Sequence, residues 1–118
     1  MAWTDYRSTP PAGTFVCDSG AVTSAVVAVD VDSEKGSFPL ILVRRPVGLR
    51  AYVNACPHQY LPLNYRGDQL LSACGTKLLC TAHGASFDAD TGAVLAGAPC
   101  ELDAVPVVED AGQIRIGS

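Results

Sequence analysis

Two stretches of the sequence decide how the chain folds and what it binds. They are residues 56–63 (CPHQYLPL) and residues 79–88 (LCTAHGASFD). Each stretch contains one cysteine and one histidine, separated by one residue in the first stretch and by two in the second. These four side chains are Cys56, His58, Cys80 and His83. Thiolate sulfur and imidazole nitrogen both bind transition metals, so the C-x-H…C-x-x-H pattern predicts a metal site built from two loops.

The residues around each pair favour tight loops. Pro57 fixes one backbone angle inside the first pair, and Gly84, directly after the second pair, allows a sharp bend. The chain has two histidines and both fall in this pattern, which argues against a chance grouping of core cysteines and ordinary histidines. Zinc also accepts two cysteines and two histidines, but zinc fingers usually pair C-x₂₋₄-C with H-x₃₋₅-H. The interleaved order fits zinc poorly, and a structural zinc module stays open as an alternative.

The composition describes one small β-rich domain. The chain has 118 residues, with 11 glycines, 8 prolines and 17% charged residues, a mixture that suits many short strands and turns. Five cysteines, an odd number, argue against a disulfide framework. The net charge of −4, without a clustered basic face, excludes nucleic-acid binding and favours a partner with a basic docking patch.

Targeting and membrane signals are not visible in the sequence. Residues 1–12 contain no continuous apolar region of the kind that a signal peptide has. No window reaches the roughly 18 apolar residues that a spanning helix requires. We therefore expect a cytoplasmic protein that does not bind a membrane.

The pattern along the chain predicts an all-β fold. Short runs of apolar and β-branched residues between turn signals predict strands at 21–31, 38–45, 49–54, 77–79, 105–109 and 113–116. Residues 88–92 (DADTG) predict a turn, and residues 110–112 (DAG) predict the loop of a closing hairpin. We expect a flexible arm over residues 1–12 and a single domain over 13–118, with a site-bearing insertion at about 53–99.

The two stretches resemble the cluster-binding loops of Rieske iron–sulfur proteins, and in more detail those of the ferredoxins of bacterial ring-hydroxylating oxygenases. The resemblance covers about residues 50–108 and includes Thr91-Gly92 and residues 97–100 (GAPC). It implies one [2Fe–2S] cluster, with one iron on the two cysteines and the other on the two histidines. It also implies an antiparallel β-sandwich or barrel as the base, with a small cluster-binding subdomain inserted in it.

The mixed ligand set has a consequence for the reduction potential. Two thiolates bring an oxidised cluster to a charge of zero, whereas four would bring it to −2, so two neutral imidazoles raise the potential to about −150 to +300 mV. The resemblance implies that high-potential relatives have a disulfide between the loops, at positions held here by Leu61 and Ala82. It further implies hydroxyl donors where this chain has Ala85 and Phe87. Fewer donors stabilise the reduced cluster less, so we expect a potential at the low end.

The resemblance implies an electron carrier and not an enzyme. A Rieske oxygenase also needs a mononuclear iron, usually held by two histidines and a carboxylate, and the cluster pattern uses both histidines of this chain. We therefore expect a monomer that takes single electrons from a flavin-dependent NAD(P)H reductase and passes them to a terminal Rieske oxygenase. The alternative is a cluster-bearing small subunit of another redox enzyme, such as nitrite reductase.

Three further features have two interpretations each. Cys17, Cys74 and Cys100 are expected to be small buried or half-buried thiols, with a Cys74–Cys100 disulfide as the alternative. Tyr60 either packs within the first loop or projects from it as a partner contact. Residues 97–99 (GAP) resemble the family's proline segment, which covers the cluster, or form an ordinary surface turn.

Overall fold

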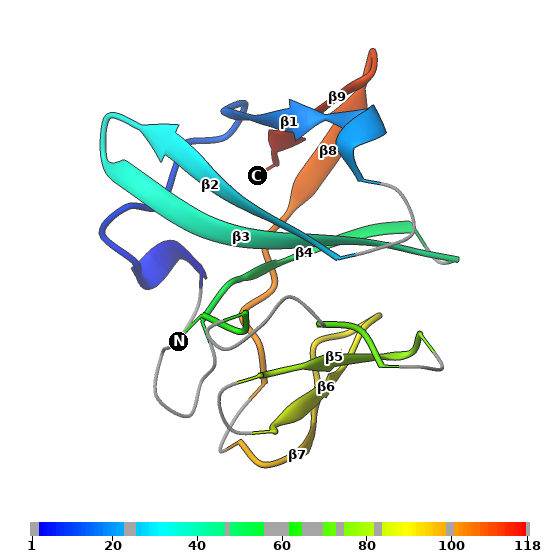
Figure 1. Ribbon diagram of the computed structural model, residues 1–118. Helices are drawn as coiled ribbons and strands as arrows, with labels where there is room; N and C mark the ends of the chain where they lie inside the picture. The colour runs from blue at the N-terminus through cyan, green and yellow to red at the C-terminus, as the bar shows by residue number, and fades with distance from the viewer. Residues whose placement is uncertain are drawn as a thin grey trace. The chain divides into compact units, whose positions relative to one another are not determined.

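The computed structural model describes residues 3–22, 26–46, 48–55, 62–64, 70–72, 75–81, 84–98 and 101–117. The chain divides into two compact units, one of Met1–Val53 with Asp103–Ser118 and the other of Asn54–Leu102. We call the first the base unit and the second the loop unit, and Figure 1 shows their strands. The described residues form antiparallel sheets, which confirms the all-β fold class. Across these ranges no helix has the length and apolar character needed to cross a membrane.

The first sheet of the base unit is a meander of β2 (Val27–Ser33), β3 (Gly36–Arg45) and β4 (Gly48–Val53). The long strand β3 lies in the middle and pairs with β2 on one side and β4 on the other. Its residues 40–43 are buried on both faces, which explains their continuous apolar sequence. The strand predicted at 21–31 begins later than expected, because Ser19–Ala21 form a short 3₁₀ helix, η2. Serine and glycine favour such a turn over an extended strand.

The second sheet of the base unit contains β1 (Phe15–Asp18), β9 (Gln113–Ile116) and β8 (Val107–Asp110), in that order. Strands β8 and β9 form the predicted closing hairpin. Its two loop residues, Ala111 and Gly112, have positive φ values of 52° and 78°. This is the combination that a two-residue loop of type I′ requires, because its twist matches that of the flanking strands.

Residues 3–10, which precede β1, pack against the rest of the base unit. Trp3 and Tyr6 make edge contacts with the buried ring of Phe38, at centroid distances of 6.4 and 5.8 Å. The Tyr6 hydroxyl donates to Oδ2 of Asp103 at 2.8 Å. Aromatic contacts of this kind offset part of the entropy lost in ordering a chain. The flexible arm expected over residues 1–12 stays a prediction.

The loop unit contains one short sheet of β5 (Lys77–Leu79), β6 (Ser86–Asp88) and β7 (Val94–Ala96), in that order. The predicted turn after β6 is confirmed. Oδ1 of Asp88 accepts hydrogen bonds from the backbone N–H groups of Asp90 and Thr91 at 2.8 and 3.1 Å. This local side-chain bonding is why an aspartate at a strand end favours a turn.

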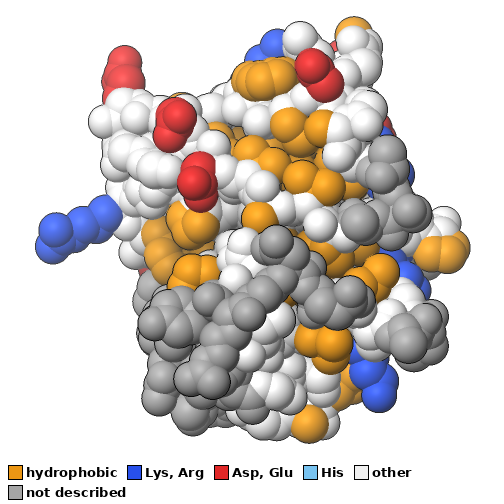
Figure 2. Space-filling view, viewed as in Figure 1, with side chains coloured by type: hydrophobic (Ala, Val, Ile, Leu, Met, Phe, Trp, Pro, Cys, Tyr) orange, Lys and Arg blue, Asp and Glu red, His pale blue; other side chains and the backbone are white. Residues whose placement is uncertain are grey.

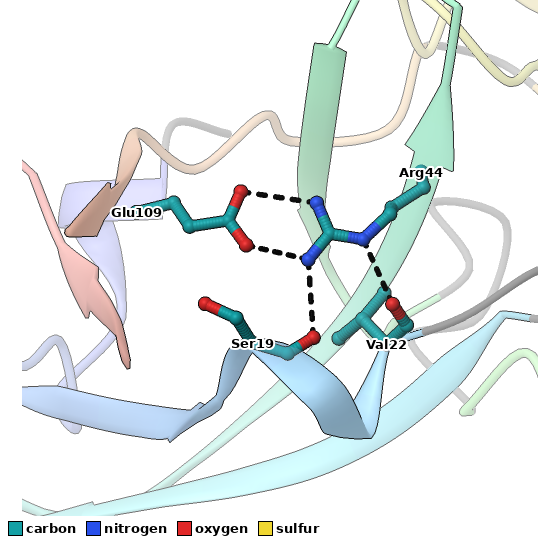
Figure 3. A network of polar contacts seen from close by, with 4 residues as sticks. All are labelled: Ser19, Val22, Arg44 and Glu109. Atoms are coloured by element: carbon teal, nitrogen blue, oxygen red, sulfur yellow. Dashed lines mark hydrogen bonds and ion pairs between the residues drawn. The ribbon is translucent and has the colours of Figure 1, made fainter. Parts of the chain in front are cut away.

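One arginine connects the two sheets of the base unit (Figure 3). Arg44 on β3 donates from Nε to the Val22 carbonyl at 2.8 Å and from Nη2 to the Ser19 carbonyl at 3.0 Å. Its two terminal nitrogens also bond both carboxylate oxygens of Glu109 on β8, at 3.0 and 2.5 Å. The guanidinium therefore makes four hydrogen bonds, one more than the three N–H donors of a lysine allow.

The described surface carries both acidic and apolar side chains. On the face in Figure 2 the acidic side chains lie over the base unit. The large hydrophobic side chains that are exposed among the described residues come from both units, Phe15, Val94, Leu95 and Val108. The guanidinium of Arg115 lies 5.8 Å from the ring of Phe15 and covers part of it. On this face the negative charge of the described residues therefore belongs to the base unit.

The β8–β9 loop gives a stability prediction. An alanine with positive φ costs roughly 1 kcal/mol because its Cβ crowds the backbone, whereas asparagine adopts this conformation readily. We expect Ala111→Asn to raise the free energy of unfolding by about 0.5–1 kcal/mol, measured by denaturant titration. Ala111→Val, with a branched side chain at the same φ, should lower it. Equal effects of the two substitutions would contradict the assigned turn.

The Arg44–Glu109 pair gives a prediction on acid stability. Hydrogen bonds from Arg44 lower the pKa of Glu109 from its ordinary value of 4.5 to about 2. A pKa lowered in the folded state contributes stability that is present above pH 4.5 and is lost as the pH falls toward about 2. We therefore expect Glu109→Gln to melt below the wild type at neutral pH, with the difference shrinking across that window.

Thermal melting followed by circular dichroism at a series of pH values measures this difference. Glu34→Gln, at an exposed position in the β2–β3 turn, is the matched control. Acid also affects any bound metal, but it does so in both variants. A gap between wild type and Glu109→Gln that stays constant through the window would show that the pair does not stabilise the fold.

Candidate metal centre

The structure describes one of the four predicted ligands, Cys80, which directly follows β5. Cys56, His58 and His83 lie outside the described residues. Cys80 is buried, with 1% of its surface exposed. It forms no disulfide with another cysteine in the part of the chain that the structure describes. A buried sulfur at the start of a loop fits the role of a metal ligand that is protected from water.

Two backbone hydrogen bonds fix Cys80 in the loop between β5 and β6. Its N–H donates to the carbonyl of Ala85 at 2.8 Å, and its carbonyl accepts from the N–H of Gly84 at 2.9 Å. These bonds bring Cys80 next to Gly84 and Ala85. Gly84 has φ +76°, which confirms the sharp bend expected from its glycine.

The segment that contains the sequence positions of Cys56 and His58 is joined at its two ends by Asn54. Oδ1 of Asn54 accepts a hydrogen bond from the N–H of Leu63 at 2.8 Å. Nδ2 of Asn54 donates to Oδ1 of Asn64 at 3.2 Å. Among the described residues Asn54 is the buried polar side chain, at 7% exposure. Burial strengthens these bonds and makes their loss costly, since an unpaired buried amide has no water to replace them.

Thr81 connects the Cys80 loop to the end of the other ligand-bearing segment. Its backbone N–H and its hydroxyl both donate to the carbonyl of Leu63, at 2.8 and 2.6 Å. The Leu63 side chain is fully buried. The peptide groups of Leu63 thus bond Asn54 through the N–H and Thr81 through the carbonyl.

Gly97, after β7, packs closely on the other end of the Cys80 loop. It has φ +79°, and a Cβ placed there would lie 3.0 Å from the Cα of Ala85. Ala85 and Phe87, the two positions without hydroxyl groups, are fully buried. The segment after β7 can therefore lie against the loop only because residue 97 has no side chain. Pro99, which the family resemblance places over the cluster, lies outside the described residues.

The donor set fits an iron–sulfur cluster, and Cys17 fits that role less well. Cys17 belongs to β1 of the base unit and is half-buried, as the sequence predicts. Burial, reinforced by the neighbouring Asp18, raises the pKa of its thiol. Cys17 also lies in a different unit from Cys80 and has no histidine near it in the sequence. Cys74 and Cys100, with the disulfide considered for them, and Tyr60 lie outside the described residues.

Comparison with known protein families assigns the chain to one of them. The family model described as the Rieske [2Fe–2S] domain matches residues 14–108. The chain belongs to the Rieske family. A Rieske domain binds one [2Fe–2S] cluster, so the cofactor predicted from the sequence is confirmed at this level. The assignment of the four individual ligands stays a prediction.

Solved structures with the same fold include ferredoxins of oxygenase systems. The ferredoxin of Sphingomonas yanoikuyae B1 is 29% identical, with a TM-score of 0.68 over 90% of this Rieske chain and 98% of that one. The ferredoxin of carbazole 1,9a-dioxygenase from Nocardioides aromaticivorans IC177 is 25% identical, with a TM-score of 0.68 over 91% and 98%. Apo dicamba monooxygenase, at 24% identity and a TM-score of 0.67, matches 93% of this chain but 33% of its own. A search of the curated proteins by sequence finds no match.

Sequence reasoning found the ligand pattern but missed the residues that support it. Nothing in the sequence around Asn54 or Leu63 signals that they bond each other, because their partners are set by how the loops fold. Thr81 lies inside the C-x-x-H motif, and its hydroxyl next to a ligand was a usable signal. Gly97 was noted for its family resemblance, and its close approach to Ala85 gives that glycine a physical reason.

The packing of Gly97 on Ala85 gives a testable prediction. Gly97→Ala places a Cβ against the Ala85 backbone at a positive φ, so the Cys80 loop must shift. Gly75→Ala is the matched control, because Gly75 has φ +76° and nothing within 4 Å of its Cβ position. Both variants should lose roughly 1 kcal/mol to backbone strain.

Only Gly97→Ala should also release iron faster to a chelator, an effect that visible absorbance follows with time. Equal release rates in the two alanine variants would show that contact with Ala85 does not support the metal centre.

Proposed function

We propose that this protein carries single electrons between a flavin-dependent NAD(P)H reductase and a terminal Rieske oxygenase. The proposal rests on the match to the Rieske family model and on the similarity to ferredoxins. The chain matches 98% of two ferredoxins, and one of these belongs to a dioxygenase. The similarity to these two ferredoxins, at 29% and 25% identity, supports a carrier role.

We assign the cluster to Cys56 and Cys80 on one iron and to His58 and His83 on the other. The cluster, when bound, supplies the capacity to hold one electron. The two thiolates provide negative charge, and the two imidazoles leave the site less negative than four thiolates would. Support from the structure comes from Cys80, whose buried sulfur starts a loop closed by hydrogen bonds to Gly84 and Ala85.

The surroundings of Cys80 support a potential at the low end of the Rieske range. The side chains of Ala85 and Phe87 are fully buried, and neither can donate a hydrogen bond. A reduced cluster carries more negative charge than an oxidised one, and each hydrogen bond to its sulfurs favours the reduced form. A site with fewer donors accepts an electron less readily. Such a potential suits a carrier that a flavin enzyme reduces.

The proposal also covers the location, oligomeric state and docking of the carrier. The protein acts as a cytoplasmic monomer that binds neither nucleic acid nor membranes. Its net charge of −4 favours docking to partners with basic patches, which steers the encounter and makes its rate fall with salt. Transfer of electrons needs a brief contact, so a small interface is sufficient.

Spectroscopy of the reduced protein tests the cluster and its ligands. We expect about two irons and two inorganic sulfides per chain and the EPR g-tensor of a [2Fe–2S] cluster with nitrogen and sulfur ligands. His83→Cys replaces a neutral imidazole with a thiolate, so the midpoint potential should fall by on the order of 100 mV or more.

Ala96→Cys, which adds a thiol on the exposed strand β7, is the control and should leave the potential unchanged. A colourless protein that contains zinc would refute the cluster. An unchanged potential in His83→Cys would refute the ligand assignment. Electron transfer to candidate oxygenases in a reconstituted assay then tests the carrier role itself.

A further inference from the structure

We propose that the Leu63 backbone fastens the two ligand-bearing loops to each other, with Asn54 and Thr81 as positioning residues. The proposal rests on the ligand assignment above, because it concerns how Cys56 and Cys80 are held at a fixed separation. It adds three residues, Asn54, Leu63 and Thr81, that are not among the four predicted ligands. Hereafter we call the hydrogen bonds among these three residues the Leu63 tie.

The first half of the Leu63 tie fixes the segment that contains Cys56. Asn54 lies two residues before Cys56 in the sequence, and Leu63 lies seven residues after it. The bond from the Leu63 N–H to Oδ1 of Asn54, at 2.8 Å, brings the ends of this segment together. Asn64 holds the other end of the Asn54 amide through the bond from Nδ2. Because both ends of the amide are bonded, Asn54 has little rotational freedom.

The second half of the Leu63 tie fixes the loop of Cys80. Thr81 is the next residue after Cys80, and its N–H and hydroxyl both bond the Leu63 carbonyl. Two donors on one residue fix its backbone and its χ1 angle together. The N–H of Cys80 is itself held by Ala85. Movement of Leu63 would therefore be transmitted to Cys80 through one bonded neighbour.

The sequence explains why such a tie matters in this chain. Residues 57–64 and 81–84 contain no cysteine, so a disulfide cannot connect these segments. Apart from a bound metal, the connection between the two loops must be noncovalent. The fully buried Leu63 side chain anchors the tie in the core of the loop unit. The bond between the Leu63 N–H and Asn54 is buried, which increases its contribution, and the Thr81 hydroxyl bond is partly buried.

The test separates a positioning role from a general effect on stability. Thr81→Val keeps the shape and the backbone N–H but removes the hydroxyl donor, and Thr81→Ser keeps the hydroxyl. Thr91→Val is the matched control, because Thr91 also uses its hydroxyl in the loop unit, where it accepts from the N–H of Ala93 at 3.2 Å. All variants are compared as purified cluster-loaded proteins.

We expect Thr81→Val to release iron to a chelator roughly tenfold faster than wild type, the size of effect that the loss of one hydrogen bond of about 1 kcal/mol gives. The EPR lines of its reduced cluster should broaden, because the separation of the ligand loops varies more from molecule to molecule. Thr81→Ser should restore both properties, and Thr91→Val should change neither.

The result that overturns the proposal is an iron-release rate and EPR line width in Thr81→Val equal to those of Thr91→Val. If Thr81→Val does not fold, Asn64→Ala removes only the bond to Asn54, and it should still accelerate iron release about threefold. Wild-type release in Asn64→Ala would then overturn the proposal. Absence of a Rieske EPR signal from the wild-type protein is a different result, since it refutes the ligand assignment on which the proposal rests.

Discussion

The constraint on which the metal centre depends is that backbone groups buried outside a sheet must still find hydrogen-bond partners. The Cys80 loop leaves the ladder after β5 and rejoins it at β6, and between these strands no neighbouring strand can satisfy its polar groups. The chain solves this by bonding the loop to itself, through Cys80, Gly84 and Ala85, and to Leu63 through Thr81. The bonds that satisfy the backbone also fix the sulfur of Cys80, so the stability of the loop and the geometry of the ligand have the same cause.

Features set by neighbouring residues could be predicted from the sequence. The turn at residues 88–92, the hairpin loop at 110–112 and the bend at Gly84 each depend on side chains or φ values within a few residues. The apolar run in β3 likewise marks a strand buried on both faces. The ligand pattern belongs to the same class, because the spacing of a cysteine and a histidine on one loop is visible in the sequence alone.

Features that depend on distant partners could not be predicted in this way. Arg44 and Glu109 are 65 residues apart, and Thr81 and Leu63 are 18 apart. Nothing near Arg44 shows that its guanidinium will bond the carbonyls of Ser19 and Val22, because those groups meet only when the two sheets of the base unit assemble. The aromatic residues at positions 3 and 6 could be taken for an arm for the same reason, since their partner Phe38 lies in a distant strand. Local propensity acts over a few residues, whereas these contacts are a property of the complete fold.

The two units differ in the interactions that can stabilise each of them. The base unit has long strands, a core centred on β3 and a charged network at Arg44. The described residues of the loop unit form three strands of three residues each, and β7 is exposed along its whole length. Sheets this short bury little apolar area, and small units of this kind usually need a disulfide or a metal to remain folded. Segments 57–64 and 81–84 contain no cysteine for a disulfide between them, so under the proposed assignment the bound cluster and the Leu63 tie connect these two segments. Metal binding of this kind favours the folded state, because the ligands are brought together only when the loops are ordered.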